Sequence, residues 1–368
     1  MSTSPPLAIG IDARAAAEVP AGRGRVVREL LRELAAREDN DHRYILYARR
    51  TWQYEALDER FRWRPIGARD PWWHLLAARA ANRECDVFLS SNSYLTAWFL
   101  RIPCVPIVYD LTTFEPSMRP NRRSTVIERA TLGLAVRRSA AFIAISQATA
   151  DALAARHPLA AKRTTVALLG VAPALVAELN SAEAAELPSP GFVLAVGTLE
   201  PRKNLPRLVD AYSRLPAEFQ DRHPLVVVGA LGWETGETLS ALHSLGESCT
   251  LLGYVTDAAL AELYRRCAVF CYPSLGEGFG LPVLEAMAAG AAVLTSNVSS
   301  LPEVGGDAVE YADASDVASI AAGLERLLES PARRAELGAL ALERAREFTW
   351  ARFAELTLAA LERATRGS

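Results

Sequence analysis

The chain has 368 residues, of which half are hydrophobic and 23% are charged, and its formal net charge is -3. This composition is that of a globular protein, at a length that usually divides into two domains. No apolar run reaches the roughly 20 residues of a membrane-spanning helix, and Met1–Pro6 lack the charged-then-apolar order of a signal peptide, so we expect a cytoplasmic protein.

Cysteine usage excludes two further classes of protein. The cysteines are odd in number and form no close CxxC pair, which favours neither a disulfide framework nor a zinc site. We therefore expect them to be small buried hydrophobes: Cys85, Cys104, Cys249, Cys267 and Cys271.

The first half of the chain is basic and the second half is acidic. Up to Asn180 there are 25 Lys and Arg against 18 Asp and Glu, and 15 against 25 follow. A basic half suits an anionic acceptor or a membrane surface rich in anionic lipid, but solvated charge without a partner gives the same counts. Several aromatic and basic residues of this half could seat a sugar-bearing acceptor or contact a membrane: Trp63, Trp72, Trp73, Trp98, Arg119, Arg122 and Arg123. Alternatively, they are core tryptophans and solvated arginines. His74, which follows Trp73, is interpreted as structural.

Short apolar runs alternate with helical patterns along the first half. Leu7–Ile11 reads as a strand, and after a loop with Gly22 and Gly24 the spacing of Val26, Val27, Leu30, Leu31 and Leu34 predicts a helix. Strands are predicted at Tyr44–Tyr47, Val87–Leu89, Val105–Tyr109, Phe142–Ile145 and Thr165–Leu168, and helices at Ser124–Arg138 and Gln147–Arg156. This alternation is typical of a parallel, doubly wound sheet.

A second series of the same kind follows a break. Val171–Pro190, with three prolines, is the predicted linker, and it places one domain at residues 1–175 and another at 176–349. Strands of the second domain are predicted at Phe192–Val196, Leu225–Val228, Thr250–Leu252, Val269–Tyr272 and Ala292–Thr295. The fold class is therefore α/β, with two Rossmann-like domains whose sheets present their carboxyl ends to a shared cleft.

The C-terminal stretch Ser315–Arg366 reads as two or three amphipathic helices with breaks near Pro331 and Thr349. Phe348 and Trp350, at the start of the last helix, are predicted to be core residues.

A glycine-rich loop that follows a strand carries the strongest chemical signal. Gly276–Pro282 leads directly into the helical pattern Val283–Gly290. Its glycines let backbone N–H groups approach a ligand, and the helix start suits a phosphate. Glu277 and Glu285 lie eight positions apart and can accept paired hydrogen bonds from the hydroxyls of a sugar and a ribose. Alternatively, they are an exposed loop acid and a helix-surface acid.

Gly197–Leu205 carries the second signal, immediately after a predicted strand. Arg202 and Lys203 stand there at the strand exit, where two cations can hold a diphosphate and neutralise the charge that grows on it as a leaving group. The alternative is a surface charge pair at a helix start.

These two blocks resemble the signature regions of family 4 glycosyltransferases of the GT-B fold, in their bacterial mannosyltransferase-like branch. The resemblance extends over most of the second half, through Gly253–Val255, Ser296–Asn297 and Leu301–Asp307. It implies that Glu277 contacts the donor sugar, that Glu285 contacts the nucleotide ribose, and that Arg202 and Lys203 bind the diphosphate.

The resemblance also implies the remaining donor-binding residues, which are Gly197, Thr198, Tyr254, Val255, Gly278, Phe279, Gly280 and Leu281. Leu252–Val255 would line the base pocket, and the last helix, 350–368, would pack back on the first domain. The implied reaction retains the anomeric configuration without a metal or a cofactor. The departing phosphate oxygen receives the proton of the acceptor on the face where the acceptor attacks.

The first half departs from the family at one position. Family members commonly carry a His-Asp pair at the exit of the strand predicted at Val105–Tyr109, with the histidine beside the donor sugar, whereas this chain has Tyr109-Asp110. Tyrosine is a poor base near neutral pH, but retention needs no strong base, so we expect activity with altered donor or acceptor choice. We include both residues in the predicted catalytic set with Arg202, Lys203 and Glu277.

The loop with Gly22 and Gly24 corresponds to the glycine-bearing first loop of the family, which approaches the donor phosphates and the acceptor. Arg23 or Arg25 would then lie near phosphate. The loop lacks the third glycine of a dinucleotide fingerprint, which argues against a nicotinamide enzyme.

The sequence thus predicts a retaining hexosyltransferase, with GDP-mannose as the leading donor because Glu200–Asn204 resembles the mannosyltransferase branch. The predicted acceptor is a glycan, a lipid-linked molecule or a small natural product, with peripheral membrane contact and no nucleic acid. A UDP-sugar transferase, a sugar-nucleotide epimerase and a catalytically silent sugar-nucleotide-binding partner remain alternatives.

Overall fold

The chain divides into two compact units. In the computed structural model, residues 5–366 are described apart from 20–21, 40, 55, 112–113, 115–121, 172–174, 176 and 178–186, and the side chains of 122–125 and 128 are also not described. One unit comprises Met1–Gly170 and Thr349–Ser368, and the other comprises Val171–Phe348. The predicted linker at Val171–Pro190 falls largely outside the described residues.

The first unit is built on a seven-stranded sheet in which all neighbours are parallel, in the order β3-β2-β1-β4-β5-β6-β7. Its strands are β1 (Ala8–Asp12), β2 (Arg43–Ala48), β3 (Phe61–Pro65), β4 (Val87–Ser90), β5 (Cys104–Val108), β6 (Phe142–Ala144) and β7 (Thr164–Val166). The sequence did not predict β3, because an edge strand with two exposed arginines carries no apolar run.

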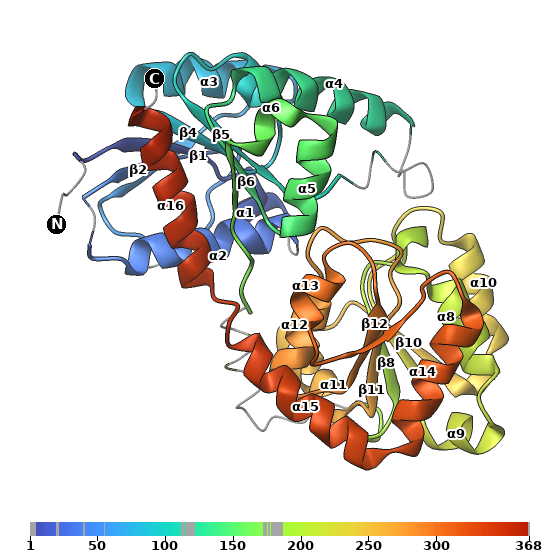
Figure 1. Ribbon diagram of the computed structural model, residues 1–368. Coiled ribbons are helices and arrows are strands. Elements are labelled where there is room, and N and C mark those ends of the chain that lie inside the picture. Colours follow the sequence, from blue (N-terminus) through green and yellow to red (C-terminus); the bar gives the residue numbers. More distant parts are fainter. Residues whose placement is uncertain are drawn as a thin grey trace. The chain divides into compact units, whose positions relative to one another are not determined.

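Helices cover both faces of this sheet (Figure 1). They are α1 (Arg14–Glu18), α2 (Arg23–Ala36), α3 (Trp72–Glu84), η1 (Leu95–Trp98), α4 (Arg122–Arg138), α5 (Gln147–Arg156), α6 (Pro158–Ala161) and α16 (Trp350–Arg366). Right-handed crossovers place α3, α4, α5 and α6 on one face and α2 on the other. The C-terminal helix α16 packs on α2 and on strands β4 to β7, so the end of the chain belongs to the first unit.

The second unit repeats this plan with a six-stranded parallel sheet, in the order β10-β9-β8-β11-β12-β13. Its strands are β8 (Val193–Val196), β9 (Leu225–Val228), β10 (Cys249–Gly253), β11 (Val269–Tyr272), β12 (Val293–Ser296) and β13 (Glu310–Ala312). Strand β13 was not predicted, because Glu310-Tyr311-Ala312 contains a charged residue and only one buried side chain, which gives no apolar run.

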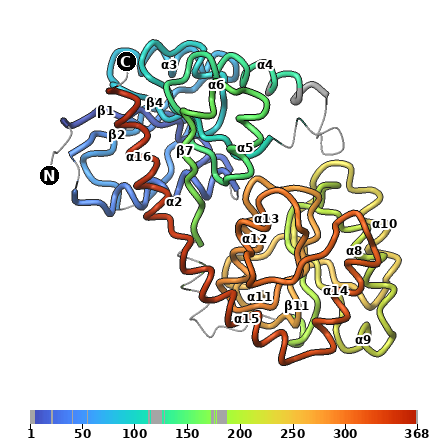
Figure 2. Tube along the Cα trace, viewed as in Figure 1, coloured from blue at the N-terminus to red at the C-terminus, as the bar shows by residue number. Residues whose placement is uncertain are grey.

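The helices of the second unit follow its strands in turn along the trace in Figure 2. They are η4 (Pro201–Lys203), α8 (Leu205–Ser213), α9 (Ala217–Arg222), α10 (Gly236–Ser244), η5 (Gly246–Ser248), α11 (Asp257–Arg266), α12 (Leu281–Ala288), α13 (Leu301–Gly305), α14 (Val317–Glu329) and α15 (Pro331–Ala345). The predicted breaks near Pro331 and Thr349 are confirmed, because they separate α14, α15 and α16. Phe348 and Trp350 are buried, as predicted for core residues.

Both units are therefore doubly wound α/β folds, as the alternation predicted. Parallel strands place all their carboxyl ends at one edge of a sheet, where the connecting loops form binding sites. In the second unit this edge is marked by backbone hydrogen bonds, since Gly197 N donates to Val228 O and Gly229 N donates to Gly253 O.

Candidate active site

The loop after β8 presents Arg202 and Lys203 at the carboxyl edge of the second sheet. The two cations end the short helix η4, and Asn204 follows in a left-handed conformation with φ of 61°. The buried amide of Asn204 fixes this turn, because its Nδ2 atom donates to Pro273 O at 2.9 Å and to Ala314 O at 2.7 Å. Asparagine tolerates this conformation better than most residues, so the turn sets where the cations lie.

The loop after β11 brings Glu277 against both cations. Lys203 Nζ donates to Glu277 Oε1 at 2.7 Å, and the Arg202 guanidinium forms an ion pair with Glu277 Oε2. The loops are also joined through their backbones, since Leu275 N donates to Arg202 O at 2.9 Å. Glu277 is buried, so the alternative of an exposed loop acid does not hold.

Three hydroxyl groups complete the surroundings of Glu277. The hydroxyls of Tyr272 and Ser274 donate to Oε1 at 2.8 and 2.6 Å, and Glu277 N donates to Ser299 Oγ at 2.8 Å. Lys203 Nζ also donates to the Tyr272 hydroxyl at 2.5 Å. We call Arg202, Lys203, Tyr272, Ser274 and Glu277 the carboxylate cluster.

The cluster keeps Glu277 ionised. Burial opposes the charged form, but Lys203 and Arg202 outweigh it and lower the pKa of Glu277 to about 2. Burial, together with the negative charge of Glu277, raises the pKa of Tyr272, so this hydroxyl stays protonated and acts as a donor. Burial lowers the pKa of Lys203, and the negative charge of Glu277 opposes this shift, so the charged forms of the two residues stabilise each other.

Glu200 and Trp233 belong to this site, although the sequence did not single them out for a role. Arg202 Nη2 donates to Glu200 Oε1 at 2.6 Å, and Trp233 Nε1 donates to Glu200 Oε2 at 3.2 Å. Arg202 Nη1 also donates to Gly276 O at 2.8 Å. The Arg202 fork is therefore oriented from three sides, a geometry that a lysine could not reproduce.

Glu285 lies about one turn into α12, as predicted, and is buried. Its Oε2 atom accepts a hydrogen bond of 3.1 Å from the Tyr264 hydroxyl on α11. Gly280 caps α12 with φ of 102°, and a Cβ atom there would meet Leu301 Cδ2 at 2.7 Å. A side chain at this position would therefore be strained as well as crowded.

Most of the other residues predicted to bind the donor from the second unit lie in loops at the same edge, and Leu281 begins α12. Thr198 follows Gly197 and is exposed, and Tyr254 follows β10 with 72% of its surface exposed. The side chain of Phe279 is buried against Phe348, with ring centroids 6.0 Å apart, so it packs the core of the unit. Val255, Gly278 and Leu281 are partly buried.

Tyr109 and Asp110 follow β5 at the carboxyl edge of the sheet in the first unit. The Tyr109 hydroxyl is buried, and among the described residues it has no hydrogen-bond partner. Burial raises the pKa of this hydroxyl, so it is neutral near pH 7. Tyr109 helps to line a pocket of about 270 Å³ together with Arg23, Asn92, Ser93, Tyr94, Ile107, Ile127 and Thr131.

Gly22 and Gly24 serve different structural roles. Gly22 caps α2 with φ of 53°, and a Cβ atom there would meet nothing within 4 Å. A Cβ atom on Gly24 would lie 1.7 Å from Val19 O, so Gly24 allows α1 and α2 to approach. Arg23 lies over the Tyr109 ring at 5.1 Å. The predicted proximity of Arg23 or Arg25 to phosphate stays a prediction.

The aromatic residues of the first unit separate into core and surface. Trp73 is fully buried under the Arg14 guanidinium, which lies 3.7 Å from its ring centroid, whereas Trp72 is exposed. His74 is buried with its Nδ1 atom 2.8 Å from Thr96 Oγ1, which agrees with a structural role.

In the part of the chain that the structure describes, no group of three or more His, Cys, Asp and Glu is arranged to hold a metal ion. The five cysteines are free; Cys249 and Cys267 are only partly buried and the other three are buried. None of the described helices is long and apolar enough to cross a membrane.

The architecture matches solved structures of the GT-B fold. Sucrose-phosphate synthase from Thermosynechococcus elongatus matches with a TM-score of 0.75 and 20% identity, over 98% of this chain and 99% of that one. The Anabaena protein HepE, solved in complex with UDP-glucose, matches with a TM-score of 0.73 and 17% identity, over 96% of this chain and 100% of that one. At these identities the likeness establishes the fold alone.

Sequence comparison assigns the family. Residues 178–344 match the family described as Glycosyl transferases group 1, and residues 20–175 match Glycosyltransferase Family 4. The chain therefore belongs to the family 4 glycosyltransferases of the GT-B fold.

Its curated relatives include several bacterial mannosyltransferases. It is 45% identical to the O-antigen chain mannosyltransferase B of Escherichia coli over 166 residues. These residues make up 44% of this chain and 42% of the relative. It is 36% identical over 154 residues to a phosphatidyl-myo-inositol mannosyltransferase of Mycolicibacterium smegmatis, covering 41% and 39%. The matched part is less than half the length of these relatives.

Proposed function

We propose that the protein is a retaining glycosyltransferase that moves mannose from a nucleotide diphosphate donor, GDP-mannose first, to a hydroxyl of an acceptor. The carboxylate cluster at the strand ends of the second sheet carries this proposal, because it joins two cations to a hydrogen-bonding carboxylate in one site. The mannosyltransferase names of several relatives support mannose as the sugar.

The cations of the cluster have the chemistry that a diphosphate needs. In this structure, Arg202 is balanced by Glu200 and Glu277, and Lys203 by Glu277. A diphosphate brings more negative charge than these carboxylates and competes for the same N–H groups. The oxygens of Glu277 that the cations release can then accept hydrogen bonds from sugar hydroxyls.

In the transfer step, the bond between the anomeric carbon and the phosphate oxygen breaks, and a bond from that carbon to the acceptor oxygen forms on the same face. The acceptor proton passes to the departing phosphate oxygen. Arg202 and Lys203 stabilise the negative charge that grows on this oxygen, so the proposed step requires no metal ion or cofactor. Tyr109 is neutral and serves as a hydrogen-bonding group, not as a base.

The partners and the location are also proposals. We propose a glycan, a lipid-linked molecule or a small natural product as the acceptor, and a cytoplasmic protein in contact with the inner face of the membrane. The basic first half of the chain supports an anionic acceptor or an anionic surface.

A donor panel tests the proposal. Thermal unfolding and slow donor hydrolysis would be measured with GDP-mannose, UDP-glucose, UDP-GlcNAc and UDP-galactose. We expect GDP-mannose to give the largest stabilisation and to release mannose. Preference for one UDP-sugar would replace the donor assignment. Donor binding without turnover on any acceptor would favour a silent binding partner, and no stabilisation by any donor would reject the proposed site.

A further inference from the structure

The loop after β9 is fastened to the loop after β8. Leu199 N donates to Ala230 O at 2.9 Å, and Gly232 N donates to Leu199 O at 3.0 Å. These bonds continue the parallel pairing of β8 with β9 beyond the ends of both strands. Trp233 comes directly after this segment, so backbone hydrogen bonds fix where it lies relative to the loop that carries Arg202.

Two glycines allow the loops to lie this close. A Cβ atom on Gly229 would lie 1.9 Å from Gly197 O, and one on Gly232 would lie 2.5 Å from Leu199 O. Both oxygens belong to the backbone and cannot move aside as the end of a flexible side chain would. The sequence therefore provides for this contact at two positions, and Trp233 is held with it.

The indole of Trp233 reaches the guanidinium of Arg202 through the carboxylate of Glu200. Trp233 Nε1 donates to Glu200 Oε2 at 3.2 Å, and Arg202 Nη2 donates to Glu200 Oε1 at 2.6 Å. The side chains of Arg202 and Glu200 are only 20% and 17% exposed, so water does little to weaken these bonds. We call this arrangement the Trp233–Glu200 bridge.

The bridge leaves part of the guanidinium open. Three of the five N–H groups of Arg202 are taken, two on Nη1 by Gly276 O and Glu277 and one on Nη2 by Glu200. The Nε atom donates to none of the residues that the structure describes. Nε and the second N–H of Nη2 can therefore meet phosphate oxygens while Glu200 keeps its hold.

We propose that Trp233 and Glu200 are positioning residues for Arg202, which hold its guanidinium toward the phosphate oxygen that leaves in the transfer step. A donor group that is already in place when the charge grows needs no reorganisation, whereas an arginine without this support would spread over several rotamers. The bridge should therefore act on kcat. This inference rests on the proposed function, because it assigns a part of the same transfer step.

Two substitutions remove the bridge with little change of shape. Trp233→Phe keeps an aromatic ring but lacks the N–H group, and we expect kcat for GDP-mannose hydrolysis or mannose transfer to fall about tenfold, with donor KM within about twofold. Glu200→Gln can accept from only one of the two donors, because its amide NH₂ group faces the other. It should lower kcat at least as much.

A double-mutant cycle tests whether Trp233 acts through Arg202. Added to Arg202→Ala, Trp233→Phe should cause no further fall in kcat, because the group that it positions is already absent. A further tenfold fall in the double variant would overturn the proposal, because Trp233 would then act by another route.

Two matched variants control the experiment. Glu234→Gln removes an exposed carboxylate next to Trp233, and Trp52→Phe replaces a partly buried tryptophan of the first unit, so both should keep the kcat of the wild type. Urea unfolding checks that each variant folds, and Glu200→Gln keeps the test valid if Trp233→Phe does not.

The outcomes separate this inference from the proposed function. Unchanged kcat in Trp233→Phe and Glu200→Gln, or a rise in donor KM alone, would overturn the positioning role while the wild type still turns over. A loss of unfolding free energy with normal kcat would assign the bridge to stability only and would also overturn it. No turnover by the wild type with any donor would reject the proposed function, and this inference with it.

Discussion

The ammonium nitrogen of Lys203 lies 2.7 Å from Oε1 of Glu277, a residue 74 positions further along the chain. The contact exists because β8 and β11 are neighbours in the sheet and their loops leave at the same edge. Both charges are largely removed from water, so each depends on the other. Stability and function are therefore coupled in this pair.

Replacing Glu277 should destabilise the protein. Glu277→Gln keeps the shape of the side chain but leaves Lys203 buried without its counter-charge, and we expect the free energy of unfolding to fall by about 3 to 5 kcal/mol. Urea unfolding measures this change. Glu336→Gln removes an exposed carboxylate that pairs with Arg333 and should cost less than about 1 kcal/mol. Similar losses in the two variants would mean that the buried pair has no special role.

The carboxylate of Glu277 should also make the free energy of unfolding depend on pH. The pKa of Glu277 is about 2 in the folded protein and 4.5 for the ordinary group, so its ionisation stabilises the fold above pH 4.5. This contribution is lost as the pH falls from 4.5 toward 2. The stability difference between the wild type and Glu277→Gln should shrink by about 3 kcal/mol across this window. A constant difference in urea unfolding across the same pH values would contradict the lowered pKa.

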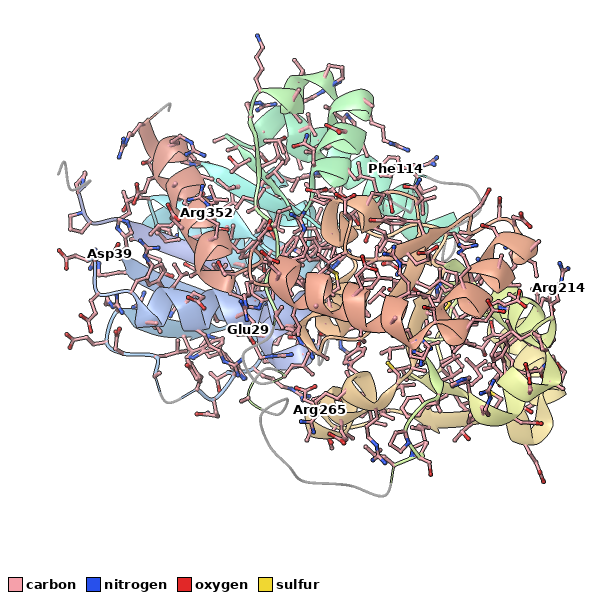
Figure 3. The ribbon with its side chains drawn as sticks, turned by 60° about the horizontal axis from the view of Figure 1, so that its bottom comes forward. Glu29, Asp39, Phe114, Arg214, Arg265 and Arg352 are labelled. Atoms are coloured by element: carbon pink, nitrogen blue, oxygen red, sulfur yellow. The ribbon has the colours of Figure 1, made fainter. Side chains whose placement is uncertain are left out.

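Arg202 should act mainly on the chemical step. Arg202→Ala removes a fork that is aimed at the growing charge, and we expect kcat to fall about 100-fold with KM little changed. The measurement is steady-state mannose transfer or donor hydrolysis with GDP-mannose. Arg214→Ala, at an exposed position of the same unit labelled in Figure 3, is the matched control and should have no effect. A change in KM alone would assign Arg202 to donor binding.

Glu285 and Tyr264 should affect donor affinity. If Glu285 binds the ribose, Glu285→Ala should raise KM for the donor about tenfold, because a hydrogen bond to a charged group is lost. Tyr264→Phe removes the hydroxyl that bonds Glu285 Oε2, so it should raise KM by a smaller factor and leave kcat unchanged. A fall in kcat with unchanged KM in either variant would place the pair in the chemical step.

Gly24 should be required for folding of the first unit. In Gly24→Ala the new methyl group would lie 1.7 Å from Val19 O, a backbone atom, so α1 and α2 must separate. We expect a loss of about 3 kcal/mol in the free energy of unfolding, measured with urea. Gly67→Ala, where a Cβ atom meets nothing within 4 Å, should change it by less than about 0.5 kcal/mol. Equal stability of the two variants would reject this packing role.

Part of the site was visible in the sequence because it is local. Arg202 and Lys203 are adjacent at a strand exit, and Glu277 lies in a glycine-rich loop, so short motifs identify them. Their partners were not visible. Tyr272 looks like one more apolar strand residue, and nothing near Glu200 in sequence indicates that Trp233 donates to it.

The sequence by itself determined the alternation of strands and helices, and with it the two doubly wound units, because the period of apolar residues is a local property of the chain. It also determined which residue types stand at the strand exits. Only the tertiary structure decided that Glu277 meets both cations, that the Tyr109 hydroxyl is buried, and that Gly24 serves packing. Those relationships depend on the order of strands in the sheet and on how closely helices approach, which no local pattern encodes.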